Sequence, residues 1–383
     1  MNKLELYFHI PFCVSKCLYC DFLSVPADKS VQDAYMEALI RETARRAGEY
    51  ENYLTDTVFI GGGTPSVVDA GWIEKLLDTV HKEFTVSDMA EITMEVNPGT
   101  VDSDRLSRYK KAGVNRLSIG LQSADNEELK RIGRIHSWED FEKTYILARQ
   151  AGFANVNVDV MSALPGQSVD SYCNTLQKVL TLNPQPEHIS SYSLIVEEGT
   201  PFFRMQEENR LILPDEDEER LMYEQTRKIL EQAGYMRYEI SNYAKEGYEC
   251  RHNCGYWRRT EYAGFGIGAA SLVGETRFQN GNDLSRYLDN PLKCRWAVQR
   301  LKEDDCMEEF MFLGLRLTAG VSMREFQERF GRSMNEVYRE VICKNCDDGL
   351  LYVRDCADGD RRVALTNRGL DLSNYVMAQF LMG

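Results

Sequence analysis

Short runs of apolar and β-branched residues alternate with amphipathic stretches through the first half of the chain. Residues 69–84 show the helical pattern clearly, because Ile73, Leu77 and Val80 recur at the spacing of one helix face. The short runs between such stretches have the composition and length of strands. The six predicted strands are residues 4–10, 57–61, 91–96, 115–120, 154–160 and 188–195.

Six strand and helix units in series predict parallel strands joined by right-handed crossovers. We therefore expect an α/β fold built on a partial (βα)6 barrel of the TIM type. In such barrels the loops at the carboxyl ends of the strands carry the chemistry. The unusual residues of this chain fall at those ends: the cysteines of residues 13–20, the glycines of residues 61–63, Glu95, Gln122 and Asp159.

Small polar residues and glycines mark the predicted ends of the helices. Ser30 and Ser137 stand where helix N-caps are expected. Gly113 and Gly152 stand just past helix ends, where a left-handed backbone is favoured.

The alternation stops near residue 200, and we expect three domains. Residues 1–200 form the barrel, and residues 201–300 form an extension rich in aromatic residues and glycine. Residues 301–383 form a smaller α+β domain, which resembles a winged helix because helical stretches precede a predicted hairpin at 349–355 and 361–369.

Composition narrows the classes of function. The chain has 383 residues, of which 43% are hydrophobic and 27% charged, and this is typical of a globular protein. A net charge of -15 disfavours nucleic acid as a partner. No apolar run is long enough to span a bilayer, and the first residues do not resemble a signal peptide. We expect a cytoplasmic protein without a transmembrane segment, with peripheral membrane contact left open.

Eleven cysteines, an odd number, favour metal or redox chemistry over a disulfide framework. Cys13, Cys17 and Cys20 form a C-x3-C-x2-C motif that can wrap three thiolates around one centre. Zinc would favour a fourth ligand, and position 22 is Phe. A [4Fe-4S] cluster with one open iron therefore fits better than zinc or three unrelated thiols. His9 is the alternative fourth ligand.

This motif, with Tyr19 before its last cysteine, resembles the signature of the radical S-adenosylmethionine (SAM) family. The segments FIGGGTPS, EITMEVNPGT, NRLSIGLQS and NVDVMSALPGQ follow in the order found in that family. Together with ISSYSLIVEEGTPF and the second half, they make nearly the whole chain similar to the group that contains the oxygen-independent coproporphyrinogen III oxidases and the related heme chaperones.

The resemblance implies a [4Fe-4S] cluster on Cys13, Cys17 and Cys20, with SAM bound beside it. Glu95 and Asp159 also end apolar strands, where an unpaired carboxylate is costly, so a partner or ligand is expected. The glycine run could instead form a tight strand-to-helix turn. Arg134 could simply lie at a helix end, and His136 could be a solvated histidine. The implied cofactor-binding residues of the barrel are Tyr7, Tyr19, Gly62, Gly63, Thr64, Glu95, Gln122, Arg134 and Asp159.

Three features favour the chaperone branch over the oxidases. The oxidases typically carry a further cysteine where this chain has Phe22, and they carry a longer amino-terminal segment. Residues 252–257 match the H-N-x-x-Y-W motif of the chaperone branch. The resemblance thus implies heme as cargo, with His252 as axial ligand and Tyr256 and Trp257 around the porphyrin.

Several alternatives remain open from the sequence. His252 could instead lie in an aromatic seam between domains, and Cys250 or Cys254 could ligate zinc or heme. The protein could be an oxygen-independent coproporphyrinogen III oxidase, which decarboxylates porphyrinogen propionates by radical chemistry. It could also be an interaction module without chemistry or a heme-opening methyltransferase. Whether it is an enzyme, which acceptor protein receives heme, and whether it forms a homodimer are also left open.

Two positions depart from the pattern of the family. Ala163 replaces the glycine of the usual GLPGQ, and Ala270 stands where a histidine is common. Cys343, Cys346 and Cys356 lack a fourth partner at zinc-site spacing and are interpreted as ordinary thiols.

Overall fold

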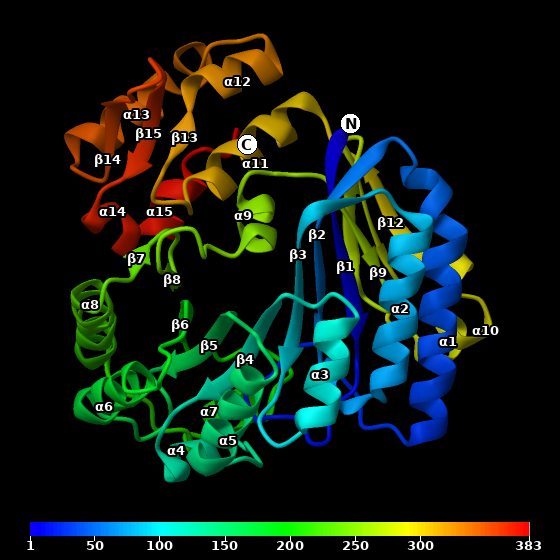
Figure 1. The fold of residues 1–383 in the computed structure, drawn as a ribbon. Helices are drawn as coiled ribbons and strands as arrows, with labels where there is room; N and C mark the ends of the chain where they lie inside the picture. The colour runs from blue at the N-terminus through cyan, green and yellow to red at the C-terminus, as the bar shows by residue number, and fades with distance from the viewer. Residues whose placement is uncertain (383) are drawn as a thin grey trace.

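The computed structural model describes residues 1–382, and its main unit is a twelve-stranded sheet curved into a partial barrel (Figure 1). Six strands lie side by side in chain order and pair in parallel. They confirm the α/β fold and its (βα)6 barrel. These strands are β1 (Asn2–Ile10), β2 (Tyr53–Gly62), β3 (Val86–Val96), β4 (Arg116–Gln122), β5 (Asn155–Ser162) and β6 (His188–Ser193).

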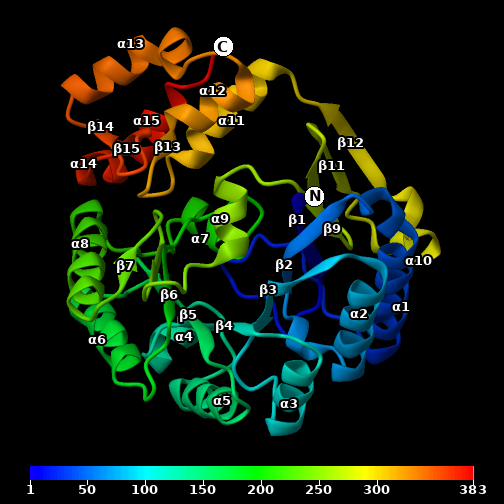
Figure 2. The same cartoon turned by 45° about the horizontal axis from the view of Figure 1, so that its top comes forward.

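Helices between the strands cover the outside of the barrel (Figure 2). Ile73, Leu77 and Val80 are fully buried, which confirms the predicted stripe on α2. Each side chain of this kind removes apolar area from water and contributes about 1.5–3 kcal/mol. The covering helices are α1 (Lys29–Arg46), α2 (Ala70–Glu83), α3 (Ser103–Lys111), α4 (Asn126–Arg131), α5 (Trp138–Gln150) and α6 (Val169–Leu180).

The predicted helix ends are correct with one exception. Ser137 caps α5, and Gly113 and Gly152 adopt positive φ just after helices. The N-cap predicted at Ser30 was wrong, because Asp28 caps α1 by accepting a hydrogen bond from the backbone N–H of Val31. An Asp carboxylate is as good a cap as a Ser hydroxyl, and Ser30 instead donates to Asp28.

The second half of the chain adds strands that the hydrophobic pattern did not predict. β9 (Tyr262–Phe265) pairs in parallel with the free edge of β1, and three antiparallel strands extend the sheet beyond it. These strands are short, and β9 pairs with a strand that lies far away in the sequence. The remaining elements of residues 201–300 are α7 (Pro201–Glu207), α8 (Glu216–Gln232), β7 (Met236–Arg237), β8 (Asn242–Ala244), α9 (Arg251–Trp257), β10 (Ala270–Val273), β11 (Thr276–Asn280), α10 (Leu284–Asp289) and β12 (Arg295–Arg300).

Helix α9 lies across the amino-terminal ends of the barrel strands, opposite the cysteine loop (Figure 1). Its first backbone N–H groups, of Arg251 and His252, donate to the carboxylate of Glu91 in β3. A carboxylate at a helix amino terminus satisfies donors that have no partner within the helix. The segment that carries the H-N-x-x-Y-W motif is thereby fixed to the base of the barrel.

The carboxyl-terminal part has a core of its own around Met311, Phe326 and Val363. The predicted hairpin is present, and a third strand joins it in the order β13-β15-β14. Helices beside a small sheet confirm the winged-helix-like character, and only Gly383 of the predicted third domain lies outside the described residues. The elements are α11 (Glu303–Gly314), β13 (Val321–Ser322), α12 (Met323–Phe330), α13 (Met334–Asp347), β14 (Leu351–Asp355), β15 (Arg361–Leu365), α14 (Asn367–Asp371) and α15 (Ser373–Ala378).

No helix within residues 1–382 has the length and apolarity that crossing a bilayer requires.

Candidate functional site

The cysteine loop follows β1 at the carboxyl end of the barrel. Cys13, Cys17 and Cys20 are all free and partly exposed. The backbone holds the loop in place, since the N–H of Leu18 donates to the carbonyl of Ile132 at 3.1 Å. Three thiols on one fixed loop, open on one side, suit a centre that must meet a small molecule.

The arrangement of the thiols also bears on the type of centre. No three His, Cys, Asp or Glu side chains within residues 1–382 are arranged to hold a single metal ion. In a [4Fe-4S] cluster each thiolate binds a different iron, so the sulfur atoms lie further apart than the ligands of one ion. Three thiols on one loop supply the donors that such a cluster takes from the protein.

The glycine run at the end of β2 is explained by close packing. Gly62 has a φ of +115°, and a Cβ there would lie 2.6 Å from the ring of His9. A Cβ on Gly63 would lie 2.8 Å from the carbonyl oxygen of Phe12. The next residue, Thr64, places its hydroxyl 3.5 Å from the sulfur of Cys13. The glycines thus bring the loop after β2 against the start of the cysteine loop.

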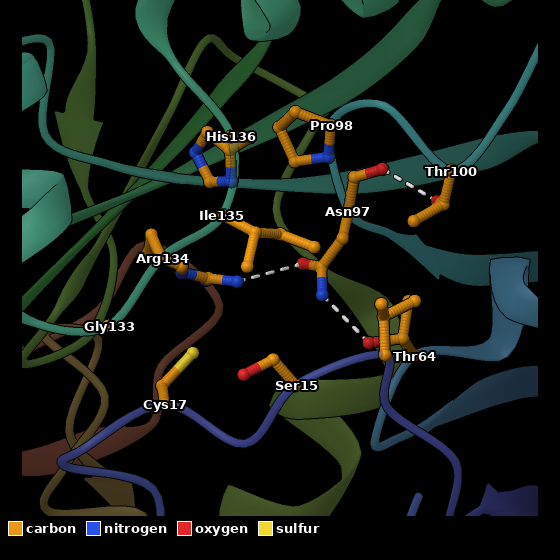
Figure 3. Close-up of a pocket in the computed structure, with 11 residues that line it drawn as sticks. Ser15, Cys17, Thr64, Asn97, Pro98, Thr100, Gly133, Arg134, Ile135 and His136 are labelled. Carbon is orange, nitrogen blue, oxygen red and sulfur yellow. Dashed lines mark hydrogen bonds between the residues drawn. The ribbon is translucent and has the colours of Figure 1, made fainter. Parts of the chain in front are cut away.

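Side chains from several loops meet at a small cavity beside the cysteine loop (Figure 3). Arg134 donates to the amide oxygen of Asn97 at 3.2 Å, and the amide nitrogen of Asn97 donates to Thr64 at 2.7 Å. Cys17 also lines this cavity. Asn97, directly after β3, thus links Arg134 to Thr64 at this cavity.

Two half-buried carboxylates, Glu95 and Asp159, lie near this end of the barrel. Glu95 accepts a hydrogen bond from the backbone N–H of Gly62 at 3.0 Å and forms no salt bridge within residues 1–382. Burial and the nearby Asp159 raise the pKa of Glu95 to about 8. Asp159 accepts hydrogen bonds from Ser118 and Asn157, and burial raises its pKa. An unpaired carboxylate such as Glu95 is well placed to receive a cationic ligand.

Two strand ends beside these carboxylates have a strained backbone. Gln122 ends β4 with a φ of +71°, and Ala163 directly follows β5 with a φ of +59°. Non-glycine residues rarely adopt this region, and they persist there only where the surrounding structure imposes it. The glycine that Ala163 replaces would adopt the same conformation without strain.

Tyr19 belongs to the cysteine loop, and His136 lies beside that loop. Arg134 is near both side chains. Burial raises the pKa of the Tyr19 phenol. The Nε2 atom of His136 lies 3.2 Å from the carbonyl oxygen of Leu121, and burial together with the Arg134 charge lowers the pKa of the imidazole to about 4. His136 is therefore a neutral, buried side chain and not a solvated one.

His252 lies inside the molecule, with 1% of its surface exposed. Its Nδ1 atom is 2.7 Å from the hydroxyl of Thr57, and its Nε2 atom is 3.0 Å from the hydroxyl of Tyr256. The ring stacks on Phe59 with centroids 5.1 Å apart. Burial lowers the pKa of His252 to about 3, so the imidazole is neutral.

A larger cavity of about 450 Å³ lies between β1, the β9 and β10 strands and α9. Its aromatic wall consists of Tyr256, Trp257 and Tyr262. The guanidinium of Arg316 covers the Trp257 ring at 4.2 Å, and the indole N–H of Trp257 has no hydrogen-bond acceptor within residues 1–382.

Two arginines contribute positive charge to the wall of this larger cavity, and no carboxylate lines it. Arg259 is buried and pairs with Glu275 and Glu309. Arg277 is partly exposed and pairs with Glu309 alone, at 2.7 Å. Ala270 lines the same cavity, at the position where the family often has histidine. The cavity therefore has aromatic and apolar walls and one guanidinium group, that of Arg277, with N–H donors left for a ligand.

The predicted site residues divide among these places. Tyr7, Tyr256 and Trp257 line the larger cavity, and Cys17, Thr64 and Arg134 line the smaller one. His252 lies behind Tyr256 and lines neither. The predicted residues that line neither cavity are Cys13, Tyr19, Cys20, Gly62, Gly63, Glu95, Gln122, Asp159 and His252.

Comparison with protein families gives two matches. A model of the radical SAM superfamily matches residues 7–179. A model of the HemN C-terminal domain matches residues 301–372.

Curated relatives match nearly the full length. The heme chaperone HemW of Bacillus subtilis (strain 168) is 37% identical over 379 residues, covering 98% of each chain. The heme chaperone HemW of Escherichia coli (strain K12) is 37% identical over 371 residues, covering 94% of this chain and 93% of the relative. A mitochondrial radical S-adenosyl methionine domain-containing protein 1 of Danio rerio is 34% identical over 353 residues, covering 87% and 79%.

One solved structure matches the entire chain. Coproporphyrinogen III oxidase (HemN) from Escherichia coli, a radical SAM enzyme, superposes with a TM-score of 0.84 at 23% identity. The match covers 100% of this chain and 90% of the oxidase. At this identity the similarity shows the fold, and it carries no argument for the oxidase reaction.

Proposed function

Since this chain belongs to the radical SAM superfamily and, within it, to the family of the HemW heme chaperones, we propose that it binds heme and delivers it to acceptor proteins, with a [4Fe-4S] cluster and SAM as cofactors. The observation that carries the heme part is the larger cavity, because Tyr256 and Trp257 of the H-N-x-x-Y-W motif form its wall. Aromatic side chains pack well on a flat macrocycle.

The charges of the cavity also suit heme, whose two propionates are anionic. Arg277 keeps part of its guanidinium free, because Glu309 is shared with Arg259. Arg binds carboxylates by paired N–H donors, so Arg277 can hold a propionate.

The carboxyl end of the barrel strands suits the cofactors. Cys13, Cys17 and Cys20 would hold the cluster, which supplies an electron for reductive cleavage of SAM. Glu95 would receive the cationic part of SAM, since a cation beside a buried carboxylate favours its charged form. Arg134, held by Asn97, would bind the carboxylate of SAM. Thr64, beside Cys13, would fix the distance between the cluster site and the SAM site.

We also place the protein in the cytoplasm. All eleven cysteines are free, and three of them form the partly exposed loop that would hold the cluster. Thiols of this kind persist in a reducing compartment.

The test is an anaerobic heme titration of the cluster-loaded protein, followed by absorbance. We expect saturable binding at one heme per chain, and weaker binding with a shifted Soret band in His252→Ala. Absence of saturable binding to the unmodified protein would contradict the chaperone function and direct attention to coproporphyrinogen or another tetrapyrrole as substrate.

A further inference from the structure

The two members of the H-N-x-x-Y-W motif that could bind iron occupy different places. Tyr256 lines the larger cavity, whereas His252 lies behind it and is 1% exposed. Both ring nitrogens of His252 are engaged, one with Thr57 and the other with the Tyr256 hydroxyl. A heme iron in the cavity is therefore closer to the Tyr256 side chain than to the His252 side chain.

We propose that the phenol oxygen of Tyr256 is the protein ligand of ferric heme in the larger cavity, and that His252 is the positioning residue that holds it. The inference rests on the proposed heme-binding function and assigns the iron ligand within it. Tyrosinate is an established ligand for heme iron in proteins.

Ligation exchanges one bond for another without oxidation or reduction. The O–H bond of Tyr256 breaks, a bond between phenolate oxygen and Fe(III) forms, and the phenol proton leaves to solvent through the open cavity. The neutral His252 can then carry its proton on Nε2 and donate it to the phenolate, while Nδ1 accepts from the Thr57 hydroxyl 2.7 Å away. A hydrogen bond to the charged form stabilises a phenolate.

The other imidazoles within residues 1–382 are poorly placed for this iron. His9 lines the cavity, but its Nδ1 atom is 3.0 Å from the Tyr7 hydroxyl and its Nε2 atom 2.8 Å from the Leu23 carbonyl oxygen. His188 is buried between Asn157 and Tyr238. His81 and His136 do not line the cavity, and position 270 is alanine.

The competing ligand is Tyr7, which also lines the cavity and also contacts a histidine. It lies on the side of the cofactor end, because the Glu95 carboxylate is close enough to raise its pKa together with burial. Tyr256 is instead flanked by Trp257 and packs edge-on against Tyr262 with centroids 4.8 Å apart. These neighbouring aromatic rings favour a porphyrin packed beside Tyr256 over one packed beside Tyr7.

The experiment is resonance Raman and EPR spectroscopy of the cluster-loaded protein with one equivalent of ferric heme. The variants are Tyr256→Phe, Tyr7→Phe and, as matched control from the same wall, Tyr262→Phe. We expect phenolate modes that shift when the protein contains deuterated tyrosine, and a high-spin ferric signal. Tyr256→Phe should lose the phenolate modes and bind heme about tenfold more weakly or worse, while Tyr262→Phe keeps them.

His252→Gln tests the positioning role by a readout that a general loss of stability would not move. The side chain of Gln keeps a hydrogen bond to the phenolate, so the phenolate modes should remain but shift in frequency. Phenolate modes that survive in Tyr256→Phe and vanish in Tyr7→Phe would overturn the proposal. Heme bound to the unmodified protein without phenolate modes would also overturn it and leave the chaperone function standing, whereas no heme binding at all would remove that function itself.

Discussion

The backbone of Gly255 in α9 packs directly on the carboxyl group of Glu5 in β1, so that a Cβ atom at position 255 would overlap Glu5. Burial and, after it, the Glu91 carboxylate raise the pKa of Glu5 well above its usual value. Because Gly255 has no Cβ, α9 can pack directly on the base of the barrel.

Gly255→Ala should lower the free energy of unfolding, because overpacking at a filled position costs about 1–3 kcal/mol. The measurement is the midpoint of urea unfolding. Gly48→Ala is the control, since a Cβ on Gly48 meets nothing within 4 Å. Equal midpoints for the two variants would show that α9 does not press on Glu5.

Cys17→Ser should lose the cluster, because a serine hydroxyl is a poor replacement for a thiolate on iron. We expect iron and sulfide per chain to fall sharply after anaerobic reconstitution, together with the EPR signal of the reduced cluster. Cys343→Ser is the matched control, because Cys343 is an exposed thiol on α13. An unchanged iron content and spectrum in Cys17→Ser would refute the ligand assignment.

Glu95 should make the stability of the SAM-free protein depend on pH. Its pKa rises from 4.5 in the unfolded chain to about 8 in the folded protein, mainly through burial. Between these values the folded protein keeps a proton that the unfolded chain releases, so stability falls as pH rises and levels off above the folded pKa. Glu95→Gln cannot ionise and should lose this part of the decline.

The urea midpoints of wild type and Glu95→Gln at about pH 5 and about pH 8.5 measure this difference. The wild-type midpoint should fall more between the two pH values than that of the variant. Glu198→Gln, which removes an exposed carboxylate, should behave as wild type. Glu95→Gln should also bind SAM more weakly, and parallel pH profiles for all three proteins would contradict the assignment.

Arg277→Gln should weaken heme binding about tenfold by removing one charged partner of a propionate. The fold should tolerate the change, because Arg259 still pairs with Glu309 at 2.8 Å. Heme dimethyl ester, which lacks the propionate charges, should bind wild type and variant equally. Arg286→Gln on α10, an 85% exposed side chain, is the control. A loss of equal size for heme and its diester would point to a steric effect and remove the propionate contact.

The barrel was predictable because its signals are local. Apolar runs such as residues 91–96 and the stripe of α2 depend on spacing along a single element, and parallel order follows from the alternation. The cysteine loop was predictable for the same reason, because its three thiols lie within eight positions of each other. The pairing of β9 with β1 was not, because the residues it joins, such as Phe8 and Phe265, lie far apart in the chain.

The (βα)6 order, the cysteine loop and the H-N-x-x-Y-W motif could all be read from residue spacing along the chain. The contacts through which Asn97 links Arg134 to Thr64, and the enclosure of His252 behind Tyr256 at the cavity wall, depend on how distant segments pack. Spacing fixes which residues share a helix face, but burial and hydrogen bonding depend on what the rest of the chain packs against that face. For α9 those neighbours come from β1, β2 and β3, about two hundred residues earlier in the chain.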